Sequence, residues 1–196
     1  MKIRSSESAL SVNDHRQVAL QALWVGLIVT VGVIFVFIPN IELISFVAFL
    51  GGIALGARRG LFVAVLGEAI FSAFNPIGSG LAFPVLYMFQ LVSVGLAGLV
   101  GGLMLPLIQR LGSVTLRATL LGVAGFMLTL IYDILTSLSL PISTGMTEGT
   151  IIGSLSAGIF FYMAHLVSNT LIYSSLGPPM IKLVNRQLLM HRLLRA

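Results

Sequence analysis

The 196-residue chain is 57% hydrophobic and only 9% charged, and its formal net charge is +5. Ordinary soluble domains have roughly 25% charged residues, so this composition, with a mean hydropathy of +1.06, predicts an integral membrane protein. No polar block is long enough for a second, soluble domain, and the absence of cysteine excludes disulfides and thiolate metal sites.

Six apolar stretches follow one another along the chain, separated by turn residues or basic residues. A helix needs roughly 17 to 25 residues to cross about 30 Å of hydrocarbon, and the third stretch is short for a full span. The predicted helices cover approximately residues 17–38, 41–57, 60–74, 83–105, 116–138 and 150–176. The sequence therefore predicts an all-α, six-transmembrane-helix bundle at residues 17–177.

Two polar segments flank this bundle. Residues 1–16 are expected to stay in the mature protein, because the apolar run after them is too long for a signal-peptide core. Gly177, Pro178 and Pro179 are expected to end the last helix, because proline removes a backbone donor and glycine is common beyond helix ends. Residues 178–196 then alternate apolar and basic side chains, which predicts a basic amphipathic helix on the membrane surface.

The basic residues give the bundle a direction. Arg58 and Arg59 follow the second apolar stretch, and lysines and arginines near helix ends are retained in the cytoplasm. With six spans, all eleven Lys and Arg residues lie on the cytoplasmic side, so we expect both termini there. A re-entrant pair formed by residues 41–57 and 60–74 would bury Arg58 and Arg59 deep in the membrane at a high cost, and we reject it.

Small residues recur on one face of the first predicted helix. Ala22, Gly26 and Thr30 are spaced four residues apart, and small side chains let a second helix approach closely. Such a face would serve either packing within the bundle or docking of a separate membrane protein. The fourth helix has a similar close-packing half around residues 97–102.

Polar side chains inside the predicted spans are the functional candidates, because they are costly in a membrane. A rise of about 1.5 Å per residue places Gln90, Tyr132 and Asp133 in the outer third of the bundle, with His165 and Glu68 near the middle. These depths favour a cavity open to the outside. The predicted substrate-binding residues are Asn40, Tyr87, Gln90, Tyr132, Asp133, His165 and Asn169.

Several of these residues also have structural interpretations. Asp133 would bind a ligand, gate the cavity or form a hydrogen bond between helices. His165 would relay protons or pair with Glu68 at similar depth, and we favour the pair. Asn169 would bond a neighbouring backbone or belong to the site, and the tyrosines would serve as packing aromatics. Glu42 and Glu148 are expected to lie in water.

No catalytic or nucleotide-binding motif accompanies these residues. The string at residues 78–80 lacks the first glycine of an intramembrane serine protease motif, and His15, His165 and His191 are too far apart for a His-Glu-x-x-His site. We therefore expect no enzymatic activity, cofactor, metal site or nucleic-acid partner. Without a Walker motif, energy for uptake has to come from a partner or a gradient.

Four segments resemble one transporter family. They are residues 38–60 with the turn before the second helix, Asn75-Pro76, Tyr132-Asp133, and the run HLVSNTLIYSSLGPP at residues 165–179. These resemble the S components of energy-coupling factor (ECF) transporters, the six-helix, substrate-binding membrane subunits of prokaryotic vitamin importers. The resemblance covers about residues 17–184.

The resemblance implies a function and partners. The chain would bind a vitamin-like micronutrient from outside and associate in the prokaryotic inner membrane with a transmembrane T component and two cytoplasmic ATPases. Family members carry an Ala-x-x-x-Ala surface in helix one for the T component. Here Ala22 matches its first position and Gly26 replaces the second alanine.

The substrate class and two rival functions remain open. The outer half carries Glu42, Asp133 and Glu148 but no Lys or Arg, so neutral or cationic substrates fit better than acids. Nickel or cobalt uptake is disfavoured, because the chain lacks the externally displayed Met-x-His arm of those S components. The rivals are a gradient-driven transporter with Glu68, Asp133 and His165 as a proton path, and a membrane scaffold subunit that binds no small molecule.

Overall fold

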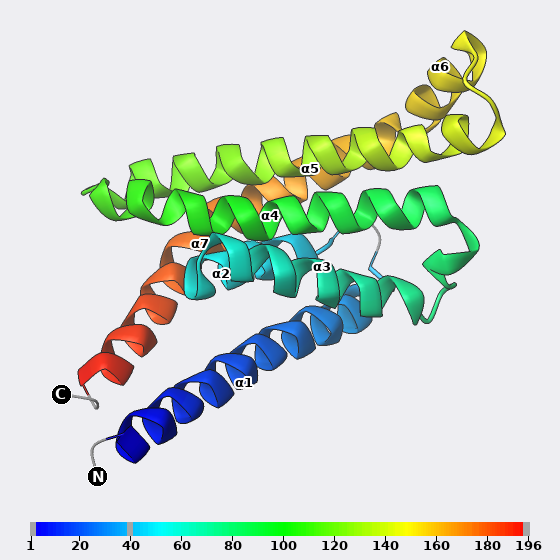
Figure 1. Ribbon diagram of the computed structural model, residues 1–196. Coiled ribbons are helices and arrows are strands. Elements are labelled where there is room, and N and C mark those ends of the chain that lie inside the picture. The colour runs from blue at the N-terminus through cyan, green and yellow to red at the C-terminus, as the bar shows by residue number, and fades with distance from the viewer. Residues whose placement is uncertain (1–2, 39–40, 194–196) are drawn as a thin grey trace.

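The computed structural model describes the backbone of residues 3–38 and 41–193 and the side chains of residues 15–38 and 41–186. Every regular element in this part of the chain is a helix (Figure 1). The elements are α1 (Ile3–Phe35), α2 (Ile44–Leu55), α3 (Ala57–Ala73), the 3-10 turn η1 (Gly80–Ala82), α4 (Pro84–Arg110), α5 (Val114–Thr144), α6 (Glu148–Ala157) and α7 (Ile159–Leu193).

Three of these helices are long and apolar enough to cross a membrane within the described residues. They are His15–Phe35 of α1, α4 and α5, and the pair α6 and α7, bent by 51°, makes a fourth if it counts as one broken span. At about 1.5 Å per residue, the 12 residues of α2 cover only about 18 Å. The helices are therefore consistent with a multi-pass membrane protein, with three or four candidate spans where the sequence predicted six.

The short helix α2 lies at the centre of the bundle. Its residues 44–53 are all buried, and it contacts α1, α3, α4 and α7. A methyl group at Gly52 would overlap the carbonyl oxygen of Gly98, and one at Gly101 would overlap that of Phe49. The backbones of α2 and α4 thus touch at glycines, which confirms the close-packing half predicted for the fourth helix.

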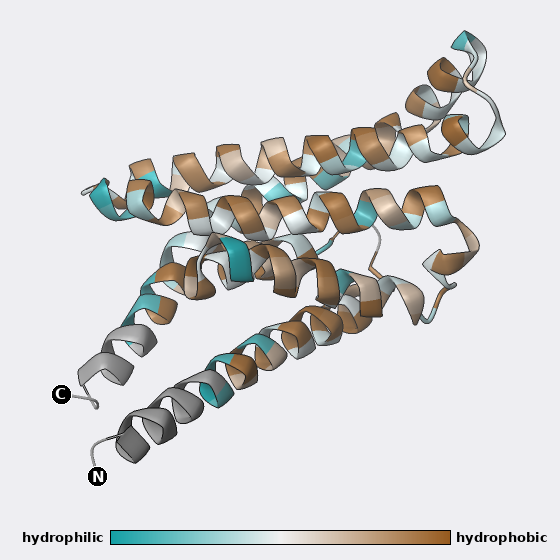
Figure 2. Cartoon of the chain, in the orientation of Figure 1, coloured by the Kyte–Doolittle hydropathy of each residue, from teal (hydrophilic) through white to brown (hydrophobic). Residues whose placement is uncertain are grey.

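The outer surface of the bundle is apolar. Figure 2 shows hydrophobic residues along the outward faces of α1, α4 and α5, and large side chains such as Leu103 and Phe126 are exposed there. Soluble proteins rarely expose apolar patches on this scale. This surface is the one expected to face lipid.

The connections between helices gather at two opposite ends. The α2–α3 turn, the α4–α5 loop, the first turns of α1 and the last turns of α7 lie at one end, on the left in Figure 1. The α3–α4 and α5–α6 connections lie on the right. The left-hand segments include Arg58, Arg59, Arg110, Arg117, Lys182 and Arg186. We call this the basic end of the bundle.

The prediction that the last helix ends at Gly177 is wrong. Helix α7 continues through Pro178 and Pro179 to Leu193, and its last part bends away from the bundle (Figure 1). Two prolines remove only two backbone hydrogen bonds, whereas Tyr173 before them and Ile181 after them are both in the hydrophobic core. Packing on both sides of the prolines therefore keeps the chain helical.

Residues 139–149, which lie between two of the predicted helices, are mostly helical as well. Helix α5 extends to Thr144 with Pro141 inside it, and α6 begins at Glu148 behind a capping box formed by Thr147 and Thr150. The expected single helix at residues 150–176 is instead bent near Gly158. This bend sets the position of the α7 side chains relative to α5.

Candidate functional site

The centre of the candidate site is His165 of α7, which lies between two carboxylates. Its Nδ1 atom is 2.7 Å from Oδ1 of Asp133 on α5, and its Nε2 atom is 3.5 Å from Oε2 of Glu42. The side chains of His165 and Asp133 are 10% and 8% exposed, and that of Glu42 is 25% exposed. Two acids and one imidazole thus form a cluster inside the bundle, where such groups are costly and usually functional.

Two predictions about this cluster are wrong. His165 pairs with Asp133 and Glu42 rather than with Glu68. Glu42 is only partly exposed, because the segment before α2 turns inward and the Glu42 carboxylate accepts a hydrogen bond from the Ser45 backbone N–H at 2.9 Å. The N-cap residue Leu43 has no side chain that can accept this bond, so Glu42 satisfies a free donor at the start of α2.

A chain of polar side chains extends the cluster to α3. The Tyr132 ring packs edge-on against the His165 ring, with 5.7 Å between centroids. Gln90 on α4 donates to the Tyr132 hydroxyl at 3.4 Å and accepts from the Ser72 hydroxyl at 2.7 Å. Side chains from α3, α4, α5 and α7 therefore form one connected polar network across the bundle.

Two small cavities adjoin this network. One, of about 260 Å³, is lined by Glu42, Tyr132, Asp133, Phe161, Tyr162 and His165. The other, of about 230 Å³, is lined by Glu42, Asn75, Gln90 and Tyr132 together with apolar residues of α1, α2 and α3. Each is slightly smaller than the roughly 300 Å³ at which small-molecule pockets begin. Glu42 and Tyr132 border both cavities and so form a shared wall.

Three buried polar atoms in this region have no hydrogen-bond partner among the described residues. They are Oδ2 of Asp133, Nε2 of His165 and Oδ1 of Asn169. The 3.5 Å between His165 Nε2 and Glu42 is too long for a good hydrogen bond. Because buried polar groups in proteins are nearly always paired, Asp133 and His165 have unused capacity for a ligand in the cavity that they line.

Apart from the imidazole of His165, the lining of both cavities is acidic or neutral. Glu42 and Asp133 contribute carboxylates, and neither cavity is lined by a described Lys or Arg. Within the same part of the chain, no group of three His, Cys, Asp or Glu side chains could hold a metal ion. The arrangement can accept hydrogen bonds from a ligand and can balance a positive charge on it.

The structure brings together four of the predicted site residues and separates the others. Gln90, Tyr132, Asp133 and His165 meet in the network described above. Asn169 is fully buried one turn further along α7, where it donates to the Thr129 hydroxyl at 2.9 Å and ties α7 to α5. Tyr87 donates to the Ala69 carbonyl at 3.2 Å and lines neither cavity. Asn40 lies outside the described residues.

Three residues that line the cavity were not among the predicted substrate-binding residues. Glu42 precedes its helix and was expected in water, whereas Phe161 and Tyr162 line the cavity from the first turn of α7. Tyr162 is also hydrogen-bonded to Ser137 of α5, which holds the two helices together beside the cavity. Residues three and four positions before His165 lie on the same side of a helix as His165. This spacing is the signal by which Phe161 and Tyr162 could have been predicted.

The small-residue face of α1 borders a third cavity. Ala22, Gly26 and Thr30 are exposed and line a groove of about 810 Å³ between α1 and α3, with Phe62 and Leu66 on the far side. A methyl group at Gly26 would meet nothing within 4 Å. In this structure the face is therefore not packed against another helix at Gly26, and we call the space the α1–α3 groove.

Comparison with known proteins gives no match. No family model, curated protein or solved structure matches the chain. The function of this chain is therefore inferred from its own residues and their geometry.

Proposed function

We propose that this chain is the substrate-binding membrane subunit of an ECF-type importer, which binds a vitamin-like micronutrient for ATP-driven uptake. The observation that carries the proposal is the cavity between α5 and α7, where Oδ2 of Asp133 has no hydrogen-bond partner among the described residues and Nε2 of His165 has only the 3.5 Å contact to Glu42. Such polar groups are expensive to bury, and a bound small molecule that hydrogen-bonds to both would offset that cost.

The direction of the bundle supports uptake from outside the cell. If the basic end lies in the cytoplasm, as lysines and arginines near helix ends favour, both termini are cytoplasmic. Asp133 is 19 residues beyond the start of α5 at that end, which corresponds to about 28 Å along the helix. The cavity then lies in the outer half of a bundle in the prokaryotic inner membrane.

The lining of the cavity favours neutral or cationic substrates. Glu42 and Asp133 would repel a carboxylate, and neither cavity has a Lys or Arg among its described lining residues to pair with it. A protonated amine or a heterocyclic cation would instead lie near both acids. The small volume of each cavity favours a compact molecule, unless the Glu42–Tyr132 wall moves and joins the two.

The α1–α3 groove is the surface that we assign to the T component, with two ATPases bound to that subunit. Its floor is made of small residues and its walls are apolar, which suits close packing of a helix from another membrane protein. Gly26 faces open space, so a larger side chain there would obstruct a partner without disturbing the fold.

Affinity purification tests this assignment. The tagged chain would be isolated in mild detergent from membranes of its source, and the co-purifying proteins identified by mass spectrometry. We expect a multi-span membrane protein and two ATPases with the unchanged chain and with Ala19→Leu, which alters an exposed position of α1 outside the groove. Ala22→Leu and Gly26→Leu should lose them. Recovery of the same partners with both groove variants would refute this docking surface.

The His165 cluster also favours a second candidate, a proton-coupled transporter that works without ATPases. An imidazole between two carboxylates is a common arrangement for proton relay in transporters. The two functions differ in a liposome experiment in which the purified chain alone is given a pH gradient and a panel of neutral and cationic vitamins. Uptake that requires the gradient and is abolished by His165→Gln would favour this second candidate, whereas binding without uptake favours the first.

A further inference from the structure

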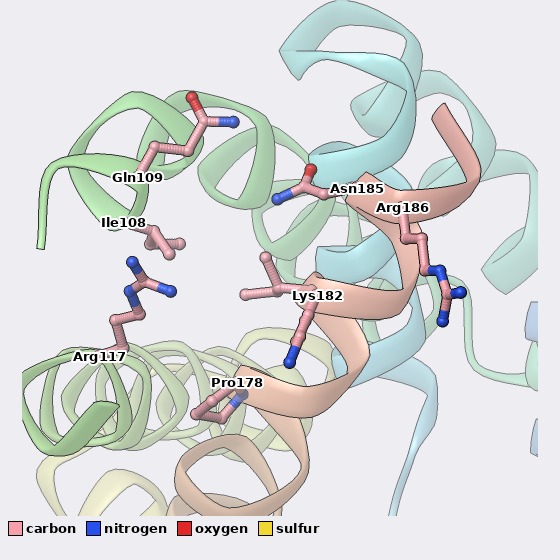
Figure 3. A pocket seen from close by; sticks show the side chains of 8 residues that line it. Ile108, Gln109, Arg117, Pro178, Lys182, Asn185 and Arg186 are labelled. Carbon is pink, nitrogen blue, oxygen red and sulfur yellow. The ribbon is translucent and has the colours of Figure 1, made fainter. Parts of the chain in front are cut away.

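A separate cavity opens at the basic end of the bundle. It has a volume of about 360 Å³ and lies between the end of α4, the start of α5 and the part of α7 beyond its prolines (Figure 3). The residues that line it are Ile108, Gln109, Arg117, Pro178, Ile181, Lys182, Asn185 and Arg186. Three of these are cations, two are amides and none is acidic.

The sequence builds this cavity from a bend and a buried floor. Pro178 lines it, and the last part of α7 bends away from the rest of the bundle. Ile108 and Ile181 are both buried and belong to the hydrophobic core. The cavity therefore has an apolar floor and a polar rim.

The polar groups of the rim are arranged to meet a ligand. The Arg117 Nε–H donates to the Leu111 carbonyl at 2.8 Å, which fixes the guanidinium group beside the α4–α5 loop. In Figure 3 this group extends from α5 toward the space below Ile108, and the amide of Asn185 faces the same space from α7. The Lys182 amine lies near Pro178, whereas Arg186 points away from the centre.

The charge of this rim is unbalanced. Arg117 and Lys182 face a common cavity whose described lining contains no Asp or Glu, and like charges that share a site repel each other. An anion between them would remove the repulsion and accept hydrogen bonds from the guanidinium, the amine and the Asn185 amide. Phosphate suits this set, because its several oxygens accept from a guanidinium fork and from an amine at once.

We propose that this cavity binds the phosphate-bearing headgroup of an anionic phospholipid. It lies at the ends of α4, α5 and α7, at the level where headgroups meet long apolar helices, and basic pockets between such helices bind anionic headgroups. The apolar floor of Ile108, Pro178 and Ile181 suits the glycerol and the first carbons of the acyl chains. This site is independent of the proposed transport function, because it shares no residue with the His165 cluster.

Native mass spectrometry of the detergent-purified chain, titrated with defined lipids, tests the proposal. The probes are phosphatidylglycerol and phosphatidylcholine with identical acyl chains, and inorganic phosphate in a parallel titration. The variants are Lys182→Gln, Arg117→Gln and the control Arg58→Gln, which removes one cation at the same end of the bundle but outside the cavity. Lys182 is exposed, so Lys182→Gln should leave the packing intact. This variant therefore tests the site even if Arg117→Gln disturbs the α4–α5 loop by removing the hydrogen bond to Leu111.

The unchanged chain should prefer phosphatidylglycerol to phosphatidylcholine. Lys182→Gln and Arg117→Gln should each weaken phosphatidylglycerol binding roughly fivefold, the ratio that corresponds to about 1 kcal/mol per cation near a membrane surface, and Arg58→Gln should leave it unchanged. Equal weakening by all three variants, or no preference between the lipids, would overturn the proposal. Inorganic phosphate that binds as tightly as the lipid would assign the site to a soluble phosphate and would also overturn it.

Discussion

Replacing His165 by leucine should destabilise the protein more than replacing either of the acids beside it. His165 is the one partner that Asp133 and Glu42 share. Removing His165 leaves the carboxylates of Asp133 and Glu42 together in one cavity, whose described lining contains no Lys or Arg to balance them. Removing Asp133 instead leaves His165 with Glu42, so a partial pair survives.

The size of each effect follows from burial. Breaking a buried ion pair by removing one partner costs about 3 to 5 kcal/mol, and we expect His165→Leu to fall in that range. Asp133→Leu should cost about 1 to 3 kcal/mol, the range for leaving one buried polar group unpaired. The double variant Asp133→Leu/His165→Leu should be more stable than His165→Leu alone, because only Glu42 remains and it is 25% exposed.

Equilibrium unfolding in mixed detergent micelles measures these differences. The chain contains a single tryptophan, Trp24 of α1, which packs against the hydrophobic core, so its fluorescence reports loss of the native bundle. His15→Leu makes the same substitution at an exposed position of α1 and should have little effect. The reasoning would be refuted if the two substitutions lowered the free energy of unfolding additively in the double variant. It would also be refuted if His165→Leu cost only about 0.6 kcal/mol, the value for an average interhelical hydrogen bond.

Two further predictions concern packing and the limits of the site. Gly101→Ala should destabilise the protein by about 1 to 3 kcal/mol, because the new methyl group would overlap the Phe49 carbonyl. The control Gly26→Ala should be nearly neutral, because a methyl group there meets nothing within 4 Å. Equal effects of the two substitutions in the same unfolding assay would contradict the close approach of α2 and α4. Asn169→Ala should lower stability by about 1 kcal/mol through loss of the hydrogen bond to Thr129, yet leave ligand retention in native mass spectrometry unchanged, because Asn169 lines neither cavity. Loss of the ligand in this variant would place Asn169 in the binding site.

The sequence was sufficient to predict where the helices lie but not where they end. Long uncharged stretches are unambiguous, so each predicted helix overlaps a helix of the structure. Pro178 and Pro179 were expected to end a helix, and Pro141 lies just beyond the predicted end of another, yet all three lie inside helices. Packing on both sides of a proline outweighs two or three lost backbone hydrogen bonds, and a local sequence rule contains no information about that packing.

The partners of the polar residues could be predicted only in part. Counting residues along straight, aligned helices placed Asp133 in the outer third and His165 at the depth of Glu68. Helix α5 in fact runs on to Thr144, and the α6–α7 pair is bent near Gly158, so Asp133 and His165 are level with each other. The inward turn before α2, which brings Glu42 to His165, left no signal in composition or spacing.

The most direct test of the proposed function is native mass spectrometry of the detergent-purified chain, in search of a small molecule that co-purifies with it. We expect a compact neutral or cationic compound bound to the unchanged chain and to Ala22→Leu. In Asp133→Asn the affinity for this compound should fall at least about tenfold, which corresponds to about 1.4 kcal/mol. A chain that carries no small molecule, or an Asp133→Asn variant that retains it fully, would contradict the assignment of the cavity between α5 and α7 as the substrate site.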